Sequence, residues 1–268
     1  MLFADQLVVV RGGGDLASGA AAQLYRAGFP VIVLELERPL AVRRRVAFAS
    51  AILEGEVIVD GIVGRREVTV DDALLTAESG EVSVMASPGL PEFDRFITTV
   101  VDGRMAKRNL GTNLDQAPLV VALGPGFEAG TDCDAVIETA RGHRLGRVIW
   151  EGAAMPDTGI PGGVGGVTSE RLLRAPGDGK VDWLVEIGDM VAAAQTLGSV
   201  GGSTIHASVG GVVRGLIAPG SVVSGGVKIG DIDPRGDRAA CFEISDKSRL
   251  VGAGVLEAVL VWLNRQAS

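Results

Sequence analysis

Residues that commonly signal nucleic-acid binding, disulfide scaffolds or structural zinc are scarce in this sequence. The 268 residues include 25 Lys and Arg against 33 Asp and Glu, and the net charge of −8 leaves no basic surface for phosphate backbones. Two histidines and two cysteines, Cys133 and Cys241, are too few for a disulfide framework or a CxxC zinc site. We therefore expect no nucleic-acid partner, no metal site and a reducing compartment.

Long apolar runs are also missing. Residues 1–5 carry no basic stretch, and the apolar run 7–10 is too short for a signal peptide. The apolar stretch 255–263 contains Glu257 and is far shorter than the roughly 20 residues that span a bilayer. These features predict a cytoplasmic protein without a membrane segment.

The residues that are abundant indicate an α/β protein. Aromatic residues make up only 4% of the chain, so a core must be built from Val, Leu, Ile and Ala, a mixture typical of buried parallel strands. The 39 glycines predict many tight turns and close backbone approaches. The length favours two modest cores over one.

The N-terminal region has the pattern of a βαβ unit. A buried strand at 7–10 precedes the glycine-rich segment 11–19, an Ala-rich helix ends at Gly28, and a second strand follows at 31–34. Strand, glycine loop, helix and strand within about thirty residues predict two parallel strands joined by a right-handed crossover.

The glycine-rich segment matches a dinucleotide-binding fingerprint. Gly12 supplies the tight turn, Gly14 the close approach of a pyrophosphate, and Ala17 the contact between helix and strand, while Glu35 ends the second strand where an acid accepts a ribose hydroxyl. The predicted nucleotide site comprises Gly12, Gly13, Gly14, Asp15, Leu16, Ala17 and Glu35. The alternative is a structural turn, because the Asp15 carboxylate would repel phosphate or cap the helix itself.

A basic cluster follows in a segment, 39–52, that we expect to be helical. Arg43, Arg44 and Arg45 could clamp a phosphate or an anionic pterin tail through charge-assisted hydrogen bonds. Consecutive helical residues point in different directions, so only one or two could reach one ligand, and a solvated helix face is the alternative.

Four further residues are candidates for catalysis. Asp102 and Lys107 follow a predicted strand at 97–101, where charges end the apolar run. Cys133 and His143 follow the strand 119–123 and its glycine loop. Neighbouring acids should raise the pKa of Cys133, so a buried structural cysteine is the alternative to a reactive thiol. His143 alone is a weak metal signal.

An internal repeat marks the C-terminal half. Residues 188–200 align without gaps on 220–232, an offset of 32, and two copies fit a two-fold barrel. The segment resembles biotinyl and lipoyl domains, but its hairpin at 200–202 lacks their modified Lys. We expect no attached biotin or lipoyl group, a docking or cofactor-shielding role, and Val212 and Val222 inside the barrel.

The predicted fold is thus α/β, with a Rossmann-like parallel sheet, a barrel-sandwich hybrid and a C-terminal helix that packs back on the first domain. Ser245 and Asp246 are the candidates for capping this helix. The expected segments are a nucleotide-binding domain at 1–115, a β-rich glycine-loop segment at 116–175, the barrel at 176–240, and the C-terminal helix at 241–268.

Several long strings in order resemble the YqeB-type accessory proteins of selenium-dependent molybdenum hydroxylases. The similarity covers essentially the whole chain, and the strings that carry it are 11–19 (RGGGDLASG), 35–48 (ELERPLAVRRRVAF), 124–146 (GPGFEAGTDCDAVIETARGHRLG), 228–236 (KIGDIDPRG) and 245–258 (SDKSRLVGAGVLEA). The resemblance implies a role in maturing enzymes akin to xanthine or purine hydroxylases, with the apo-hydroxylase as partner. The opening segment also resembles XdhC-type factors, which are thought to handle molybdenum cofactor.

Three functions remain open at this point. One is a maturation factor that binds a nucleotide or molybdopterin dinucleotide and helps to load or selenate it. Another is a nucleotide- or NAD(P)-dependent enzyme, for which Glu35 is the motive. The third is a non-catalytic adaptor whose barrel docks the hydroxylase.

Overall fold

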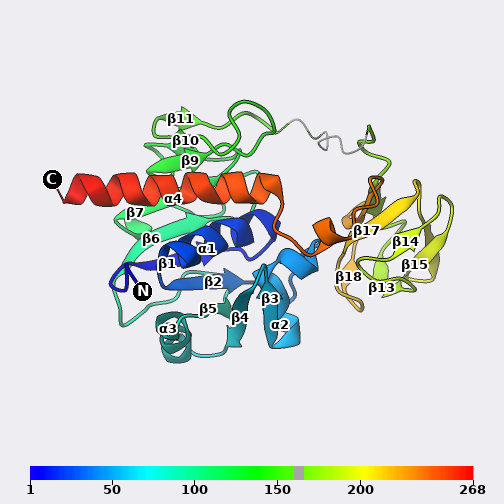
Figure 1. Cartoon of the computed structure of the whole chain (residues 1–268), viewed down its shortest axis with the longest axis horizontal. Helices are drawn as coiled ribbons and strands as arrows, with labels where there is room; N and C mark the ends of the chain where they lie inside the picture. Colours follow the sequence, from blue (N-terminus) through cyan, green and yellow to red (C-terminus); the bar gives the residue numbers. More distant parts are fainter. Residues whose placement is uncertain (158, 160–165, 268) are drawn as a thin grey trace. The chain divides into compact units, whose positions relative to one another are not determined.

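The chain forms two compact units in the computed structural model, which describes residues 1–157, 159 and 166–267. Each unit is assembled from segments that are far apart in the sequence. The first unit consists of Met1–Pro39, Ala47–Thr158 and Ile244–Ser268, and the second of Leu40–Val46 and Gly159–Glu243. The structure is therefore a mixed α/β protein, since the first unit contains a large, mainly parallel sheet and the second is built from antiparallel strands (Figure 1).

Six parallel strands form the centre of the sheet in the first unit. Their spatial order is β9-β7-β6-β1-β2-β5. The bounds are β1 (Leu7–Arg11), β2 (Val31–Glu35), β5 (Val82–Ala86), β6 (Ile97–Asp102), β7 (Leu119–Leu123) and β9 (Ala135–Ile137). Every residue of β1 and β7 is buried, as expected for strands covered on both faces.

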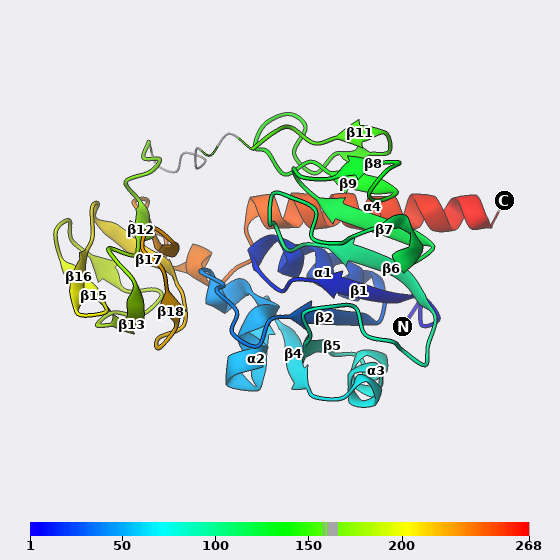
Figure 2. The ribbon, with the colours of Figure 1, turned by 180° about the vertical axis from the view of Figure 1, so that it is seen from behind.

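Further strands extend the sheet at both edges. The hairpin of β3 (Glu56–Val59) and β4 (Ile62–Glu67) follows β5, with β4 parallel to β5, and β10 (Val148–Ile149) pairs with β9. A separate pair, β8 (Glu128–Ala129) and β11 (Gly152–Ala153), lies in the loops beyond β7 and β9 (Figure 2).

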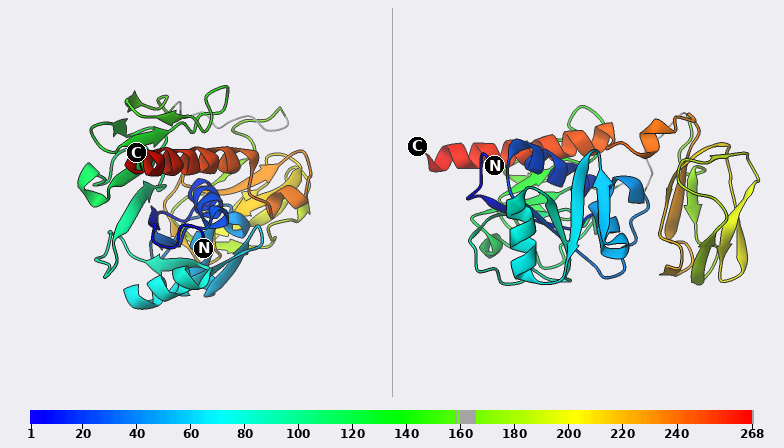
Figure 3. Two further views of the ribbon diagram at one scale, coloured as in Figure 1. Left: turned by 60° about the vertical axis from the view of Figure 1, so that its left-hand side comes forward. Right: turned by 60° about the horizontal axis from the view of Figure 1, so that its bottom comes forward.

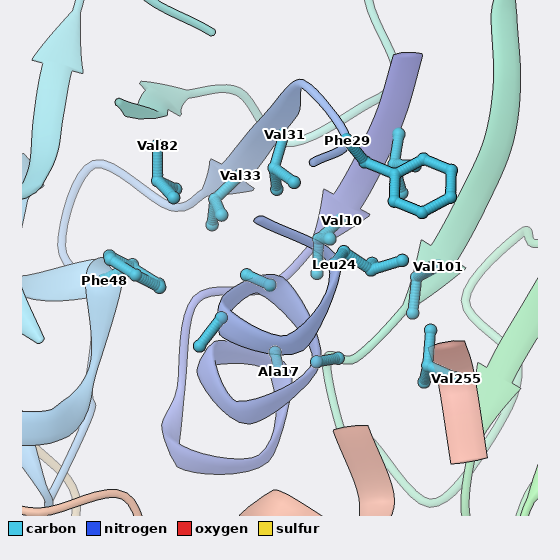
Figure 4. Packing of buried hydrophobic residues seen from close by; sticks show 14 of the residues in the cluster. Val10, Ala17, Leu24, Phe29, Val31, Val33, Phe48, Val82, Val101 and Val255 are labelled. Carbon is cyan, nitrogen blue, oxygen red and sulfur yellow. The ribbon is translucent and has the colours of Figure 1, made fainter. Parts of the chain in front are cut away.

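Helices cover both faces of this sheet. On one face, α1 (Asp15–Ala27) and α4 (Asp246–Gln266) share a core with the Val side chains of the central strands, and Figure 4 shows Leu24 and Val255 within it. On the other face, α3 (Val70–Ser79) packs Ala73 and Ala77 against alternate residues of the same strands. This two-sided burial follows from the period of two in a strand.

The C-terminal helix packs on α1, as we expected. Gly19 and Gly252 make this close crossing possible: a Cβ on Gly19 would lie 2.3 Å from the carbonyl oxygen of Ser248, and one on Gly252 would lie 2.4 Å from that of Gly19. The two helices lie side by side in Figures 1 and 3. Only residues without side chains allow the two backbones to approach this closely.

Two predictions about segment boundaries differ from the structure. The boundary at 115/116 separates β6 from β7, which are hydrogen-bonded neighbours in one sheet. The predicted helix at 39–52 is instead two 3-10 turns, Arg44–Val46 and Phe48–Ser50, followed by α2 (Ala51–Glu54). This segment crosses between the units, and extended backbone at Ala47 (φ −128°, ψ 118°) interrupts any helix.

The second unit consists of two four-stranded antiparallel sheets around one apolar core (Figure 3). Their orders are β12-β19-β17-β14 and β16-β15-β13-β18. The strands are β12 (Leu172–Arg174), β13 (Gly179–Trp183), β14 (Met190–Val191), β15 (Thr196–Val200), β16 (Ser203–His206), β17 (Gly211–Leu216), β18 (Val222–Val223) and β19 (Lys228–Asp233).

The 32-residue repeat extends to the eight strands of the two sheets in this unit. A shift of 32 residues places β12 to β15 on β16 to β19 and converts the strand order of one sheet into that of the other. Pairing follows the same rule, because Met190 faces Val212 and Lys180 faces Val222. Each copy therefore contributes two strands to each sheet, so neither copy has a complete core alone.

The predicted inward position is correct for Val212 and wrong for Val222. Val212 is fully buried, whereas Val222 is 70% exposed and Val223 takes the inward position. Neighbouring residues of a strand point to opposite faces, so an error of one residue inverts the assignment. Met190, the counterpart of Val222 in the first copy, is also exposed.

Candidate functional site

The predicted glycine loop lies where the direction of the sheet reverses. From β1 the chain proceeds to β2 and β5 on one side, whereas β6, β7 and β9 continue on the other. Arg11 at the end of β1 is paired in register with Asp102 at the end of β6. In open α/β sheets, ligands bind in the crevice outside the carboxyl ends of the strands at such a reversal.

The three glycines of the loop have different surroundings. Gly12 has φ +93°, and a Cβ there would lie 3.0 Å from the backbone of Arg104. A Cβ on Gly13 would lie 2.7 Å from the amide nitrogen of Ala49. Gly14 has no heavy atom within 4 Å of its Cβ position, so it alone of the three opens onto free space.

The next three residues begin α1. Asp15 turns its carboxylate toward α4, where Oδ1 accepts a hydrogen bond of 2.5 Å from the Ser248 hydroxyl. Leu16 packs against the core. Ala17 is buried against the chain after β6, since a Cβ on Gly103 would lie 2.6 Å from its methyl group. The third small residue of the fingerprint thus allows the helix to approach the strand end, as predicted.

Glu35 faces the glycine loop from the end of β2. Its carboxylate accepts hydrogen bonds from the backbone amides of Leu36, at 3.0 Å, and of Gly13. Burial raises the pKa of Glu35, and the two amide hydrogen bonds offset only part of this effect. The carboxylate therefore lies at the loop itself, in the position that the sequence analysis assigned to a ribose contact.

Asp102 belongs to a buried charge network. Its carboxylate accepts hydrogen bonds from the Arg104 guanidinium, at 2.5 Å to Nη2, and from the Thr112 hydroxyl, also at 2.5 Å. Arg11 in turn donates to Thr112 at 3.1 Å. Burial would raise the pKa of Asp102, but the bonds from Arg104 and Thr112 hold it below its ordinary value. The network fixes the segment after β6 against the glycine loop.

The thiol of Cys133 lies in a small apolar cluster with Phe127 and Val136. It is fully buried, and burial, with the charges of Asp132 and Asp134, raises its pKa to about 12. The predicted direction of this shift is confirmed. Such a thiol holds no appreciable thiolate at neutral pH, so the structure favours the structural alternative.

The other two catalytic candidates are exposed. Lys107 forms an ion pair of 2.6 Å with Asp157, and His143 lies on the loop between β9 and β10. Lys107 has an unusual backbone conformation, with φ +60°. Within the described residues, the structure brings together no group of three or more His, Cys, Asp or Glu side chains suited to a metal ion.

The basic cluster makes structural contacts within the second unit. Arg43 is buried and donates to the carbonyl oxygens of Ala240 at 2.8 Å and Glu243 at 3.2 Å. Arg44 donates a hydrogen bond to the carbonyl oxygen of Leu216 at 2.8 Å. Both guanidiniums thus tie the segment 40–46 to the rest of the second unit, and a role for Arg43 and Arg44 in ligand binding stays a prediction.

Four residues near the glycine loop were missed from the sequence. Arg104 and Thr112 complete the network of Asp102, and Lys247 and Ser248 lie in the first turn of α4. The string 245–258 did single out the last two, but nothing local indicated that they lie beside α1. A hollow of about 710 Å³ near the start of β6 and β7, lined by Phe93–Ile97 and Asp115–Pro118, contains none of the predicted residues.

Comparison with known proteins supports the YqeB family name. The Escherichia coli K12 protein named "Uncharacterized protein YqeB" is 48% identical over 261 residues, which are 97% of this chain and 48% of that protein. The chain thus spans about half the length of this curated relative. No protein-family model matches the sequence. Among the described helices, none has the length and apolar character required to cross a membrane.

Likeness to solved structures is weak. An aspartoacylase family protein from Mesorhizobium loti is 15% identical with a TM-score of 0.29, and the match covers 85% of this chain and 84% of that one. The ectoine utilization protein EutE from Ruegeria pomeroyi is 13% identical with a TM-score of 0.23, covering 85% and 57%. Scores this low carry no argument about fold or function.

Proposed function

We propose that the first unit is a Rossmann-like domain that binds the phosphates of a nucleotide or dinucleotide at the glycine loop. The order β5-β2-β1-β6-β7-β9 corresponds to 3-2-1-4-5-6, the order of doubly wound dinucleotide-binding sheets. The observation that carries the proposal is the free space at Gly14, at the start of α1 and between the ends of β1 and β6. Amides at a helix N-terminus favour a phosphate there.

In this proposal, the contact of Asp15 with α4 directs its carboxylate away from the phosphate. Its carboxylate accepts a hydrogen bond from Ser248, on α4, and is thereby drawn toward the other helix. The structure thus supplies a partner for the residue that departs from the simpler fingerprint.

The proposed biological role is maturation of selenium-dependent molybdenum hydroxylases. Its motive is the set of sequence strings that resemble YqeB-type accessory proteins, and a molybdopterin dinucleotide combines the nucleotide and phosphates that a site of this kind binds. In this proposal the barrel-sandwich fold of the second unit, with its glycine hairpin at Gly201–Gly202 and no attached group, docks the apo-hydroxylase.

A second candidate function is an NAD-dependent enzyme. Glu35 favours it, because a carboxylate at the end of the second strand of such a fold accepts a hydrogen bond from a hydroxyl of the adenosine ribose. The two functions share the loop and differ in the ligand.

Native mass spectrometry of the protein purified from a selenium-replete host tests the choice. A retained molybdopterin dinucleotide supports maturation, and retained NAD supports the enzyme. Calorimetric titration of the ligand-free protein with ADP, CDP, GDP and NAD tests the shared step. If none of these binds and no nucleotide is retained, the nucleotide site is refuted.

A further inference from the structure

Lys247 lies in the first turn of α4, and the N-terminal half of this helix is packed on two sides. On one side Gly19 allows α1 to approach, as described above. On the other side, a Cβ on Gly254 would lie 2.1 Å from the carbonyl oxygen of Gly146, in the loop between β9 and β10. Ser248, which follows Lys247 in the sequence, donates a hydrogen bond to Asp15 at the start of α1. The first turns of α1 and α4 are therefore neighbours.

Lys247 is surrounded by charged groups that already have other partners. Both carboxylate oxygens of buried Glu138 accept hydrogen bonds from backbone amides, one from Ala140 at 2.7 Å and one from Met155 at 2.8 Å. Asp246 pairs with Arg141 at 2.8 Å. The charges of these three side chains and of Asp15 all shift the pKa of Lys247. Yet within residues 1–157, 159 and 166–267, the ammonium group forms no hydrogen bond or ion pair.

A half-buried ammonium without a partner is energetically unfavourable. Burial lowers the pKa of Lys247, and the positive charge of Arg141 lowers it further, although three carboxylates oppose this. An anion beside the two first turns would remove this cost, and the free space at Gly14 is at the first of these turns. Lysine commonly binds phosphate in this way, as a compact point charge.

We propose that Lys247 is a binding residue of the nucleotide site, whose ammonium contacts the phosphate held by the first turn of α1. The proposal rests on the proposed function and adds a charged contact that the fingerprint does not contain. It requires an anionic group of the ligand at this position, and an uncharged nucleoside has no such group.

The test is calorimetric titration of the full chain with ADP and with pyrophosphate. Lys247→Met should weaken the binding of both by at least tenfold, and Lys247→Arg should restore most of the affinity. Arg249→Met is the matched control, because it removes an exposed positive charge from the same helix end, and it should bind as the wild type does. Melting curves of all variants show whether each is folded.

The outcomes separate this proposal from the proposed function. If the wild type binds ADP and Lys247→Met binds it equally well, the role of Lys247 is refuted and the nucleotide site stands. If the wild type binds pyrophosphate through Lys247 but no nucleotide, the anion contact stands and the nucleotide function is refuted. If the wild type binds neither, both are refuted.

Discussion

Gly14 offers a direct way to separate ligand binding from folding. Its backbone, with φ −70° and ψ −177°, is open to any L-residue, and its Cβ position is free of contacts. Replacing a glycine by alanine at such a position stabilises a protein by about 0.4–1 kcal/mol, because the unfolded chain loses freedom. Gly14 is also the N-cap of α1, where alanine is less favourable than glycine by a similar amount, so we expect Gly14→Ala to melt within about 2 °C of the wild type.

The effect on binding should be much larger. A side chain at Gly14 occupies the space proposed for the phosphate, so Gly14→Ala should weaken nucleotide binding by at least tenfold, about 1.4 kcal/mol, and Gly14→Val should abolish it. The matched control is Gly13→Ala, whose Cβ would lie 2.7 Å from Ala49 and 3.0 Å from Val33. Such overpacking costs about 1–3 kcal/mol.

Thermal melting and calorimetry on the same samples decide the matter. The reasoning is refuted if Gly14→Val binds nucleotide with wild-type affinity, since the free space would then not hold the phosphate. It is also refuted if Gly14→Ala loses as much stability as Gly13→Ala, since the surroundings of the two glycines would then not differ.

Three further predictions concern the charged and thiol groups. Glu35→Gln should stabilise the ligand-free protein at pH 8 but not at pH 4. The raised pKa of Glu35 stabilises the folded protein below the unfolded pKa of about 4.3, and this contribution is lost as the pH rises. Melting curves against pH measure the effect, with the exposed Glu37→Gln as the control. Asp102→Asn should cost about 3 kcal/mol by leaving Arg11 and Arg104 without their counter-charge. In urea titrations this difference should be constant above about pH 5 and shrink as pH falls through the lowered pKa of Asp102. The Cys133 thiol should react with Ellman's reagent at pH 8 only in denaturant, and rapid labelling of the folded protein would restore the case for a reactive thiol.

The sequence predicted the elements of the first unit better than their grouping. The βαβ unit was recognisable because strand, loop and helix signals occur within thirty residues. The strands β7 and β9 were assigned to another segment, since the chain between β6 and β7 and between β7 and β9 contains no α-helix. The helix that covers this part of the sheet is α4, more than one hundred residues further along, and no local pattern indicates such a replacement.

In the second unit, only 13 of the 32 residues of each copy were recognised as a repeat. These are residues 188–200 and 220–232, whereas β12 and β16 correspond in structure without an identical residue at the 32-residue offset. Pairing between strands maintains the symmetry there through backbone hydrogen bonds, which do not depend on residue type. The position of Val222 was wrong for a related reason: in a strand of two residues, Val222–Val223, alternation gives too little signal to decide which residue points inward.

The glycine loop was predicted from the sequence, but the groups that complete it were not, because they come from the far end of the chain. Asp15 and Ser248 are 233 residues apart, and their contact depends on where α4 crosses α1. That crossing is set by Gly19 and Gly252, which a helical pattern alone presents as weak helix formers. Their value is steric: they fix the position of α4 along α1, and this position places Ser248 on Asp15 and Lys247 beside the loop. Gly19 of α1 and Gly252 of α4 therefore contribute to the proposed site by positioning the two helices.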